Sequence, residues 1–235
     1  MSSASSWSRA DERASLWFFK LGERLPRSAW KVLEYSGDGI LWLILAATLI
    51  GIGFSNRLRT VESSHDINLK DENRPTLAEY SLMMGVNLLI GLVIDLIEVG
   101  LLKMIFKRPR PHHNSFAKDM NIIVPVDAFS FPSGHSSRVS FLAQYALLFF
   151  PKHHPLNLVV VIWALTVALS RCMMGRHYCS DVFAGLLLGY GTTWLLTKGA
   201  IERNSMLCTQ ECISEMLSKG FAVRQHLKTI PRLLS

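Results

Sequence analysis

The chain has 235 residues, of which 49% are hydrophobic and 18% are charged. This length allows one domain with short tails, and this composition excludes a disordered chain and is unusual for a soluble domain. The net charge is +7, but the basic residues flank long apolar blocks, so they point to lipid phosphates and a phosphorylated ligand and not to nucleic acid. The apolar blocks indicate a helical membrane protein.

The N-terminal region lacks a long apolar block. Residues 1–13 are rich in serine and charge, and we expect them to be disordered. Residues 14–33 mix apolar and basic side chains and predict an interfacial helix broken near Pro26. An ordinary packing helix fits the same pattern equally well.

Five apolar blocks follow and predict membrane spans at 40–54, 77–106, 136–150, 155–170 and 182–197. Polar loops are expected at 55–76 and 107–135. The sequence thus predicts an all-α, multi-span helical membrane bundle with about five transmembrane helices and an N-terminal interfacial helix. Its parts are a tail and interfacial helix (1–36), a membrane-embedded domain (37–200) and a C-terminal tail (201–235).

Three polar segments, at 103–111, 131–135 and 170–181, carry the chemistry. The first closes the second span and the second opens the third span, so both lie on one membrane face. The third and fourth spans cross away and return, which brings the third segment to the same face. The topology therefore predicts that basic and histidine residues from separate spans gather at one surface.

A phosphoryl group suits this set of residues. Lys103, Arg110 and Arg171 are three cations that can hold three phosphoryl oxygens. Ser133 and Gly134 stand at a helix start, where main-chain N–H groups favour an anion. These five residues are the predicted phosphate-binding set.

Two histidines and an aspartate complete a hydrolytic site. His177 and Asp181 are four residues apart and share a face on a helical turn. A carboxylate on one ring nitrogen would leave the other nitrogen of His177 as a nucleophile. His135, from another span, can protonate the leaving oxygen. The pattern predicts a phosphatase in which cations replace magnesium, with no metal and no cofactor.

The three segments resemble the signature of the type 2 phosphatidic acid phosphatase superfamily. That signature reads K-x6-R-P, P-S-G-H and S-R-x5-H-x3-D, and the segments here match without substitution. The resemblance implies that His177 forms a phosphohistidine, that Asp181 orients it, and that His135 is the general acid and then the base. It also implies that Lys103, Arg110 and Arg171 bind the phosphate.

Within the superfamily the chain is most similar to polyisoprenoid diphosphate (presqualene diphosphate) phosphatases. The supporting stretches are 33–40, 126–135 and 175–177. This likeness implies a substrate such as farnesyl, geranylgeranyl or presqualene diphosphate. Several predicted spans are short, which suits a thin bilayer, so we expect a location in the endoplasmic reticulum and nuclear envelope. The balance of Lys and Arg does not decide which side of the membrane the site faces, and the oligomeric state is open.

Two alternatives stay open. A phosphatidate, lysophosphatidate or sphingoid-base phosphate phosphatase would carry the same motifs, because the motifs do not read the lipid tail. A catalytically silent membrane scaffold of the same fold would be expected to lose a catalytic residue, and here His135, His177 and Asp181 are all present.

Other polar residues have less specific roles. Arg138, three residues after His135, and Arg108 are candidate contacts for the second phosphate of a diphosphate. Asp95 lies inside a span, and we expect it to form an interhelical hydrogen bond. The four cysteines show no zinc or redox spacing and are expected to be free thiols.

Overall fold

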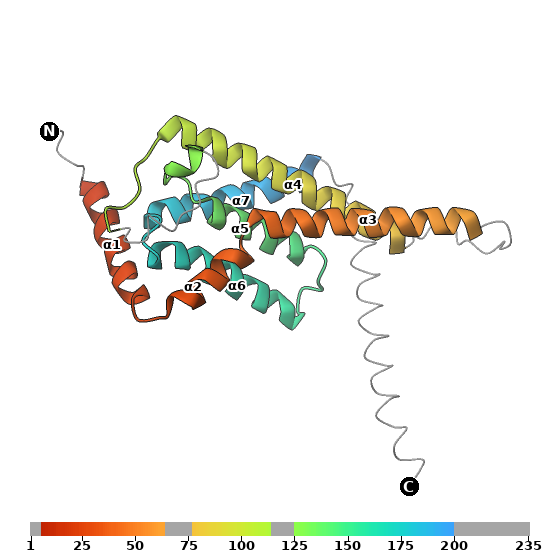
Figure 1. Cartoon of the computed structure of the whole chain (residues 1–235), viewed down its shortest axis with the longest axis horizontal. Coiled ribbons are helices and arrows are strands. Elements are labelled where there is room, and N and C mark those ends of the chain that lie inside the picture. Colours follow the sequence, from red (N-terminus) through yellow and green to blue (C-terminus); the bar gives the residue numbers. More distant parts are fainter. Residues whose placement is uncertain (1–5, 64–76, 114–124, 200–235) are drawn as a thin grey trace, which may run out of the picture.

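A computed structural model describes residues 6–63, 77–113 and 125–199 (Figure 1). The α-helices in this part of the chain are α1 (Ser6–Gly22), α2 (Arg27–Ser36), α3 (Gly39–Ser63), α4 (Leu77–Phe106), α5 (Gly134–Leu147), α6 (Pro155–Met173) and α7 (Cys179–Gly199). A short 3-10 helix spans Pro125–Ala128.

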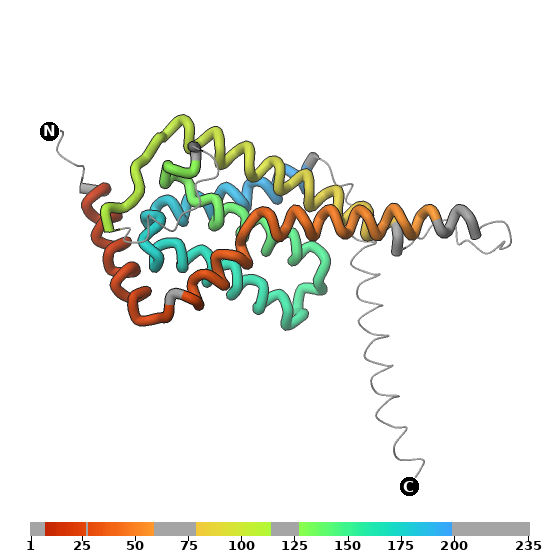
Figure 2. Tube along the Cα trace, in the orientation of Figure 1, coloured from red at the N-terminus to blue at the C-terminus, as the bar shows by residue number. Residues whose placement is uncertain are grey.

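Helices α3 to α7 form a bundle with an apolar exterior. Helices α3 and α4 run side by side, and α5 packs against α4, α6 and α7 (Figures 1 and 2). Large apolar side chains are exposed on the outer faces, among them Ile44, Ile105, Leu158 and Phe183. An apolar outer surface suits lipid and not water as the surrounding solvent. This arrangement confirms the predicted membrane bundle.

Length and hydropathy alone mark two helices of the described residues as able to cross a membrane, Gly39–Leu58 and Pro155–Met173. Helix α5 has only 14 residues, which gives a length of about 21 Å at ~1.5 Å per residue. It is surrounded by neighbouring helices, and its side chains Val139, Phe141 and Leu142 are buried. Helix α5 is therefore the centre of the bundle.

Small residues allow the helices to approach closely. A Cβ atom at Gly185 of α7 would lie 2.5 Å from the carbonyl oxygen of Ser133, and one at Gly189 would collide with the carbonyl of Ser137. At Gly85 of α4, a Cβ atom would lie 2.9 Å from the carbonyl oxygen of Ala46. Such contacts are typical of membrane helix pairs. The contacts of Gly185 and Gly189 bring α7 directly against the start of α5, where the second polar segment lies.

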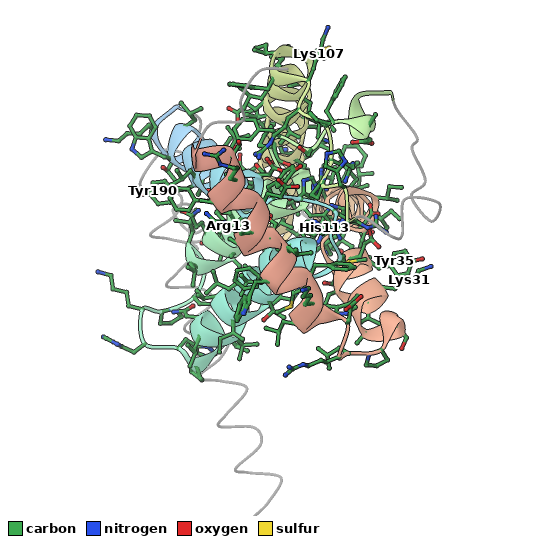
Figure 3. All side chains as sticks on the ribbon, turned by 90° about the vertical axis from the view of Figure 1, so that its left-hand side faces the viewer. Arg13, Lys31, Tyr35, Lys107, His113 and Tyr190 are labelled. Carbon is green, nitrogen blue, oxygen red and sulfur yellow. The ribbon has the colours of Figure 1, made fainter. Side chains whose placement is uncertain are left out.

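Helices α1 and α2 cover one end of this bundle. Figure 3 looks at that end, and α1 crosses in front of the bundle. Ser15 and Phe19 of α1 are buried against the bundle, whereas Leu16 and Trp17 are exposed. Pro26 separates the two helices, as predicted. The segment thus packs on the bundle and also presents apolar side chains outward at the level of the helix ends.

The structure corrects two expectations. Residues 6–13, expected to be disordered, belong to α1, because Asp11 is held by side chains of the bundle. Residues 55–63, expected to be a loop, continue α3, since extending an existing helix is far easier than starting one. Residues 1–5, 64–76, 114–124 and 200–235 lie outside the described residues, and with them parts of the expected loops, the start of the N-terminal tail and the C-terminal tail at 201–235.

Candidate active site

The three polar segments meet at the end of the bundle that α1 covers, as the topology predicts. The main-chain N–H of Ser133 donates to the carbonyl oxygen of Asp181 at 3.0 Å. Arg110 Nη1 donates to the carbonyl oxygen of Arg176 at 3.0 Å. These two contacts join the second segment and the first segment to the third.

Residues with positive φ orient the first and the third polar segment. Lys107 has a φ of 45° directly after α4, a left-handed position that ends a helix. The chain then runs toward α1 (Figure 2), where the ring of His113 lies 5.2 Å from that of Phe19. Gly175 has a φ of 67° in the turn between α6 and α7, which a glycine adopts without strain. His177 lies in that turn, two residues after Gly175.

The ring of His177 is held in one tautomer. Nδ1 lies 2.7 Å from the carbonyl oxygen of Ser130. A carbonyl only accepts, so Nδ1 carries the proton and Nε2 carries the lone pair. Burial lowers the pKa of His177 to about 4, although the neighbouring Asp181 opposes this shift. The imidazole is therefore neutral near pH 7, with an unprotonated Nε2.

Asp181 lies close to His177 but has other partners. Its Oδ2 is 3.7 Å from His177 Nδ1, beyond hydrogen-bond distance, and accepts from the main-chain N–H of Tyr178 at 2.9 Å. Its Oδ1 accepts from Arg108 Nη1 at 2.7 Å. The carboxylate thus lies close to the imidazole without a hydrogen bond to it, while the Ser130 carbonyl sets the ring orientation.

Cations and carboxylates alternate through the site. Asp127 binds Lys103 Nζ at 2.7 Å through its side chain and Arg110 Nη2 at 2.6 Å through its carbonyl oxygen. Glu34 binds both Arg171 and Arg176, at 3.2 and 2.6 Å. Burial, and then the charge of Arg176, lower the pKa of Arg110 to about 10, so it stays protonated at neutral pH. Several cationic side chains thus lie close together, and their mutual repulsion favours the binding of an added anion.

Among the described residues, three buried nitrogens that belong to predicted site residues lack a hydrogen-bond partner: Arg110 Nε, Arg171 Nε and His135 Nε2. Unsatisfied buried polar groups are rare and call for an explanation. Here they belong to three residues that the sequence assigns to a phosphate or to its leaving oxygen. An anion with several acceptor oxygens would satisfy all three.

Other predicted site residues are held by protein contacts. Arg108 binds Asp11, Ser180 and Asp181. Arg138 Nε is 3.6 Å from Asp95. Ser133 uses its hydroxyl to cap α5 by accepting from the N–H of Ser136 at 3.4 Å.

The hydroxyl of Ser137 donates to Asp95, which confirms the interhelical hydrogen bond expected for Asp95. Cys172 and Cys179 are free thiols. Among the described residues, no group of three His, Cys, Asp or Glu side chains is arranged to hold a metal ion.

Comparison with known proteins agrees with this geometry. The model of the PAP2 superfamily matches residues 79–205, which contain all three segments. The chain belongs to the PAP2 superfamily. PAP2 phosphatases are metal-independent and use a histidine-based mechanism.

Curated PAP2 relatives come from plants, bacteria and archaea. The chain is 40% identical to the probable lipid phosphate phosphatase beta of Arabidopsis thaliana, over 44% of this chain and 60% of the relative. It is 37% identical to the lipid A 1-phosphatase of Rhizobium etli, over 59% and 60%. The undecaprenyl-diphosphatase of Sulfolobus acidocaldarius is 33% identical, over 48% and 53%. The chain therefore spans about half to 60% of the length of these relatives.

The PAP2 fold also appears in a solved structure. The crystal structure of a transmembrane PAP2 type phosphatidylglycerolphosphate phosphatase from Bacillus subtilis superimposes with a TM-score of 0.57 at 21% identity. The similarity covers 86% of this chain and 90% of that chain. This likeness supports the fold, including helices that precede the matched PAP2 segment.

Sequence reasoning did not find several contacts of this PAP2 site. The Ser130 carbonyl at His177 Nδ1 is a main-chain group, which no side-chain pattern reveals. Glu34 and Asp11 are acidic residues far from the signature in sequence, whereas Asp127 lies five residues before its second motif. Glu34 and Asp127 lie inside two of the three stretches that suggested a likeness to polyisoprenoid diphosphate phosphatases, which was the available signal.

Proposed function

We propose that this PAP2 protein is a membrane phosphatase that hydrolyses lipid phosphates or diphosphates through a phosphohistidine at His177. The observation that carries the proposal is the set of unpartnered donors beside a neutral imidazole. Arg110, Arg171 and His135 each offer a buried N–H or ring nitrogen, and His177 Nε2 is free of the proton. In this proposal these residues form a binding site for a phosphoryl group next to a nucleophile.

The first chemical step transfers the phosphoryl group to the enzyme. His177 Nε2 forms a bond to phosphorus while the bond from phosphorus to the lipid oxygen breaks. His135, which takes up a proton when the anionic phosphate binds, gives that proton to the leaving oxygen. Lys103, Arg110 and Arg171 stabilise charge on the three phosphoryl oxygens. The positive charge on the phosphorylated imidazole faces Asp181.

The second step releases phosphate. His135, now neutral, removes a proton from water as the water oxygen attacks phosphorus. The bond between phosphorus and Nε2 breaks, and the electron pair returns to His177. The net reaction consumes one water and yields inorganic phosphate and the dephosphorylated lipid. These steps use no metal ion and no cofactor.

The substrate class that we propose is isoprenoid diphosphates and their monophosphates. The likeness to an undecaprenyl-diphosphatase and the cations beyond the three of the signature support this class. Within this proposal, Arg138 and Arg108 would contact a second phosphate only by exchanging present partners. A phosphatidate-type substrate is the second candidate, favoured by the Arabidopsis relative.

A cavity of about 270 Å³ lies beside the site, between α1, α2 and the end of α6. Phe19, Trp30 and Met174 line it together with Arg176. Apolar and aromatic walls that end at a guanidinium suit the apolar chain of a lipid next to its phosphate. We propose a location in the endoplasmic reticulum and nuclear envelope, because the short predicted spans suit a thin bilayer.

Phosphate release in excess EDTA tests the substrate class. Detergent-solubilised protein is offered farnesyl diphosphate and phosphatidate side by side, with His177→Ala as the blank. The proposal predicts activity in EDTA that is lost in the variant and a higher kcat/KM for the diphosphate. A higher kcat/KM for phosphatidate would reverse the substrate assignment. No turnover of either lipid by folded protein would favour the scaffold.

A further inference from the structure

Glu34 reaches the cationic pocket from α2, a helix that precedes the matched PAP2 segment. A single carboxylate oxygen, Oε1, accepts from Arg171 Nη2 at 3.2 Å and is 2.6 Å from Arg176 Nη1. The side chains of Arg171 and Arg176 are 2% and 8% exposed. One oxygen atom therefore holds two buried guanidinium groups together.

Helix α2 is fixed to the bundle directly after Glu34. The hydroxyl of Ser36 accepts from Trp163 Nε1 at 3.1 Å, and its carbonyl oxygen accepts from Trp42 Nε1 at 2.8 Å. A Cβ atom at Gly37 would lie 3.0 Å from Val167 and 3.5 Å from His135. Glu34 is thus held at a fixed position relative to α5 and α6.

The contact decides which donors of Arg171 remain available. Nη2 donates to Glu34 and Nη1 to the sulfur of Met174 at 3.6 Å, which leaves Nε without a partner in the described part of the chain. A guanidinium is planar, so fixing its outer nitrogens also fixes the direction of Nε. The charges of Arg110 and Arg176 repel Arg171, and a carboxylate between two guanidinium groups offsets that repulsion.

We propose that Glu34 is a positioning residue of the phosphate pocket: it holds the guanidinium groups of Arg171 and Arg176 in place, so that the Nε–H of Arg171 meets the phosphoryl oxygens. The inference rests on the proposed function only in taking the ligand to be a phosphoryl group. The competing explanation is that Glu34 is a counter-anion that fills the pocket and must be displaced. The two explanations predict opposite changes in phosphate affinity when Glu34 is removed.

The test uses the full chain in detergent and two readouts. The first is affinity for inorganic phosphate, measured by thermal stabilisation, which needs no turnover. The second is kcat and KM for the better of farnesyl diphosphate and phosphatidate. The variants are Glu34→Ala, Glu34→Gln and Glu34→Asp. Glu79→Gln is the matched control, because it removes the same charge from an exposed side chain in the first turn of α4, at the opposite end of that helix from Lys103.

For Glu34→Ala we expect phosphate affinity to fall about tenfold and kcat/KM to fall roughly tenfold to a hundredfold, since misplaced binding groups cost that much. Glu34→Gln should recover most of both, because its amide oxygen can accept from both arginines. Glu34→Asp is one methylene shorter and should lie between Gln and Ala. Glu79→Gln should behave as the wild type.

Two results would overturn the proposal. Tighter phosphate binding in Glu34→Ala and Glu34→Gln would identify Glu34 as a competing anion, and unchanged affinity in Glu34→Ala would show that it does not position the arginines. If Glu34→Ala does not fold, the Glu34→Asp variant decides instead. Phosphate affinity and kcat/KM equal to those of the wild type in Glu34→Asp would likewise overturn the proposal. A wild-type protein that binds phosphate but turns over no lipid would defeat the proposed function, while the affinity series would still decide the role of Glu34.

Discussion

At the scale of single residues, the protonation state of His177 depends on burial and on a main-chain acceptor. The Ser130 carbonyl at 2.7 Å keeps the proton on Nδ1 of His177, and burial disfavours a second proton. In the proposed mechanism, Asp181, at 3.7 Å, stabilises the charge that forms when Nε2 bonds to phosphorus. The resting ring is thus neutral and oriented before any substrate arrives.

The low pKa of His177 makes a prediction about stability and pH. The folded-state value is about 4, against 6.5 for an ordinary histidine. As the pH falls, the unfolded chain takes up this proton first, so the stability contributed by the neutral ring is complete above pH 6.5 and is lost between pH 6.5 and 4. His177→Gln cannot titrate, so its Tm should fall less than that of the wild type over this window. Parallel Tm curves would contradict the shift.

At the scale of helices, the site depends on the close packing of α5 and α7. Gly185 of α7 faces the carbonyl of Ser133, whose N–H in turn donates to Asp181. The small residue therefore lets the second and third motifs share a hydrogen bond. Any separation of the two helices would move His135 away from His177.

Replacing Gly185 by alanine tests this packing. The added methyl would lie 2.5 Å from the Ser133 carbonyl oxygen, and we expect Gly185→Ala to destabilise the protein by about 1–3 kcal/mol and to lower kcat/KM. Gly191→Ala, on the same helix, meets nothing within 4 Å and should be neutral or stabilise by roughly 0.5–1 kcal/mol. Thermal unfolding and turnover of both variants give the answer, and equal effects would rule out a packing role.

Hydropathy predicted the bundle helices well, whereas the signature motifs predicted only part of the candidate site. The span at 77–106 coincides with α4, because twenty or more apolar residues leave few alternatives in a membrane. The signature located His135, His177 and Asp181, since its spacing is local. The contact between Glu34 and Arg171 joins residues 137 positions apart, and no local pattern encodes it. The helix at 6–13 was missed for the same reason, because contacts with the bundle stabilise it.

At the scale of the whole molecule, the charged end of the bundle is covered by the N-terminal helices. Asp11 of α1 accepts from Arg108 Nη2 at 2.8 Å, and Arg108 binds Asp181 through Nη1. Ser15 of α1 accepts from the N–H of Cys179 at 3.0 Å. Helix α1 is therefore connected to the catalytic aspartate of the proposed mechanism through one guanidinium.

Removing the Asp11 carboxylate should weaken both stability and catalysis. Asp11→Ala breaks the ion pair with Arg108, whose side chain is 28% exposed, so we expect a loss of about 1–2 kcal/mol, less than for a fully buried pair. Glu12→Ala, the exposed neighbour, is the control. Tm and kcat/KM should fall for Asp11→Ala alone. A loss of Tm without a change in kcat/KM would mean that α1 stabilises the bundle without tuning the site.

The central claim, that His177 carries the phosphoryl group, is tested most directly by trapping the intermediate. The enzyme is mixed with lipid phosphate in excess EDTA, quenched in base to preserve a phosphohistidine, and mapped by mass spectrometry. We predict one phosphoryl group on His177, formed before steady-state phosphate release and absent from His177→Ala. Full turnover with no phosphorylated enzyme, or phosphate on another residue, would contradict the mechanism.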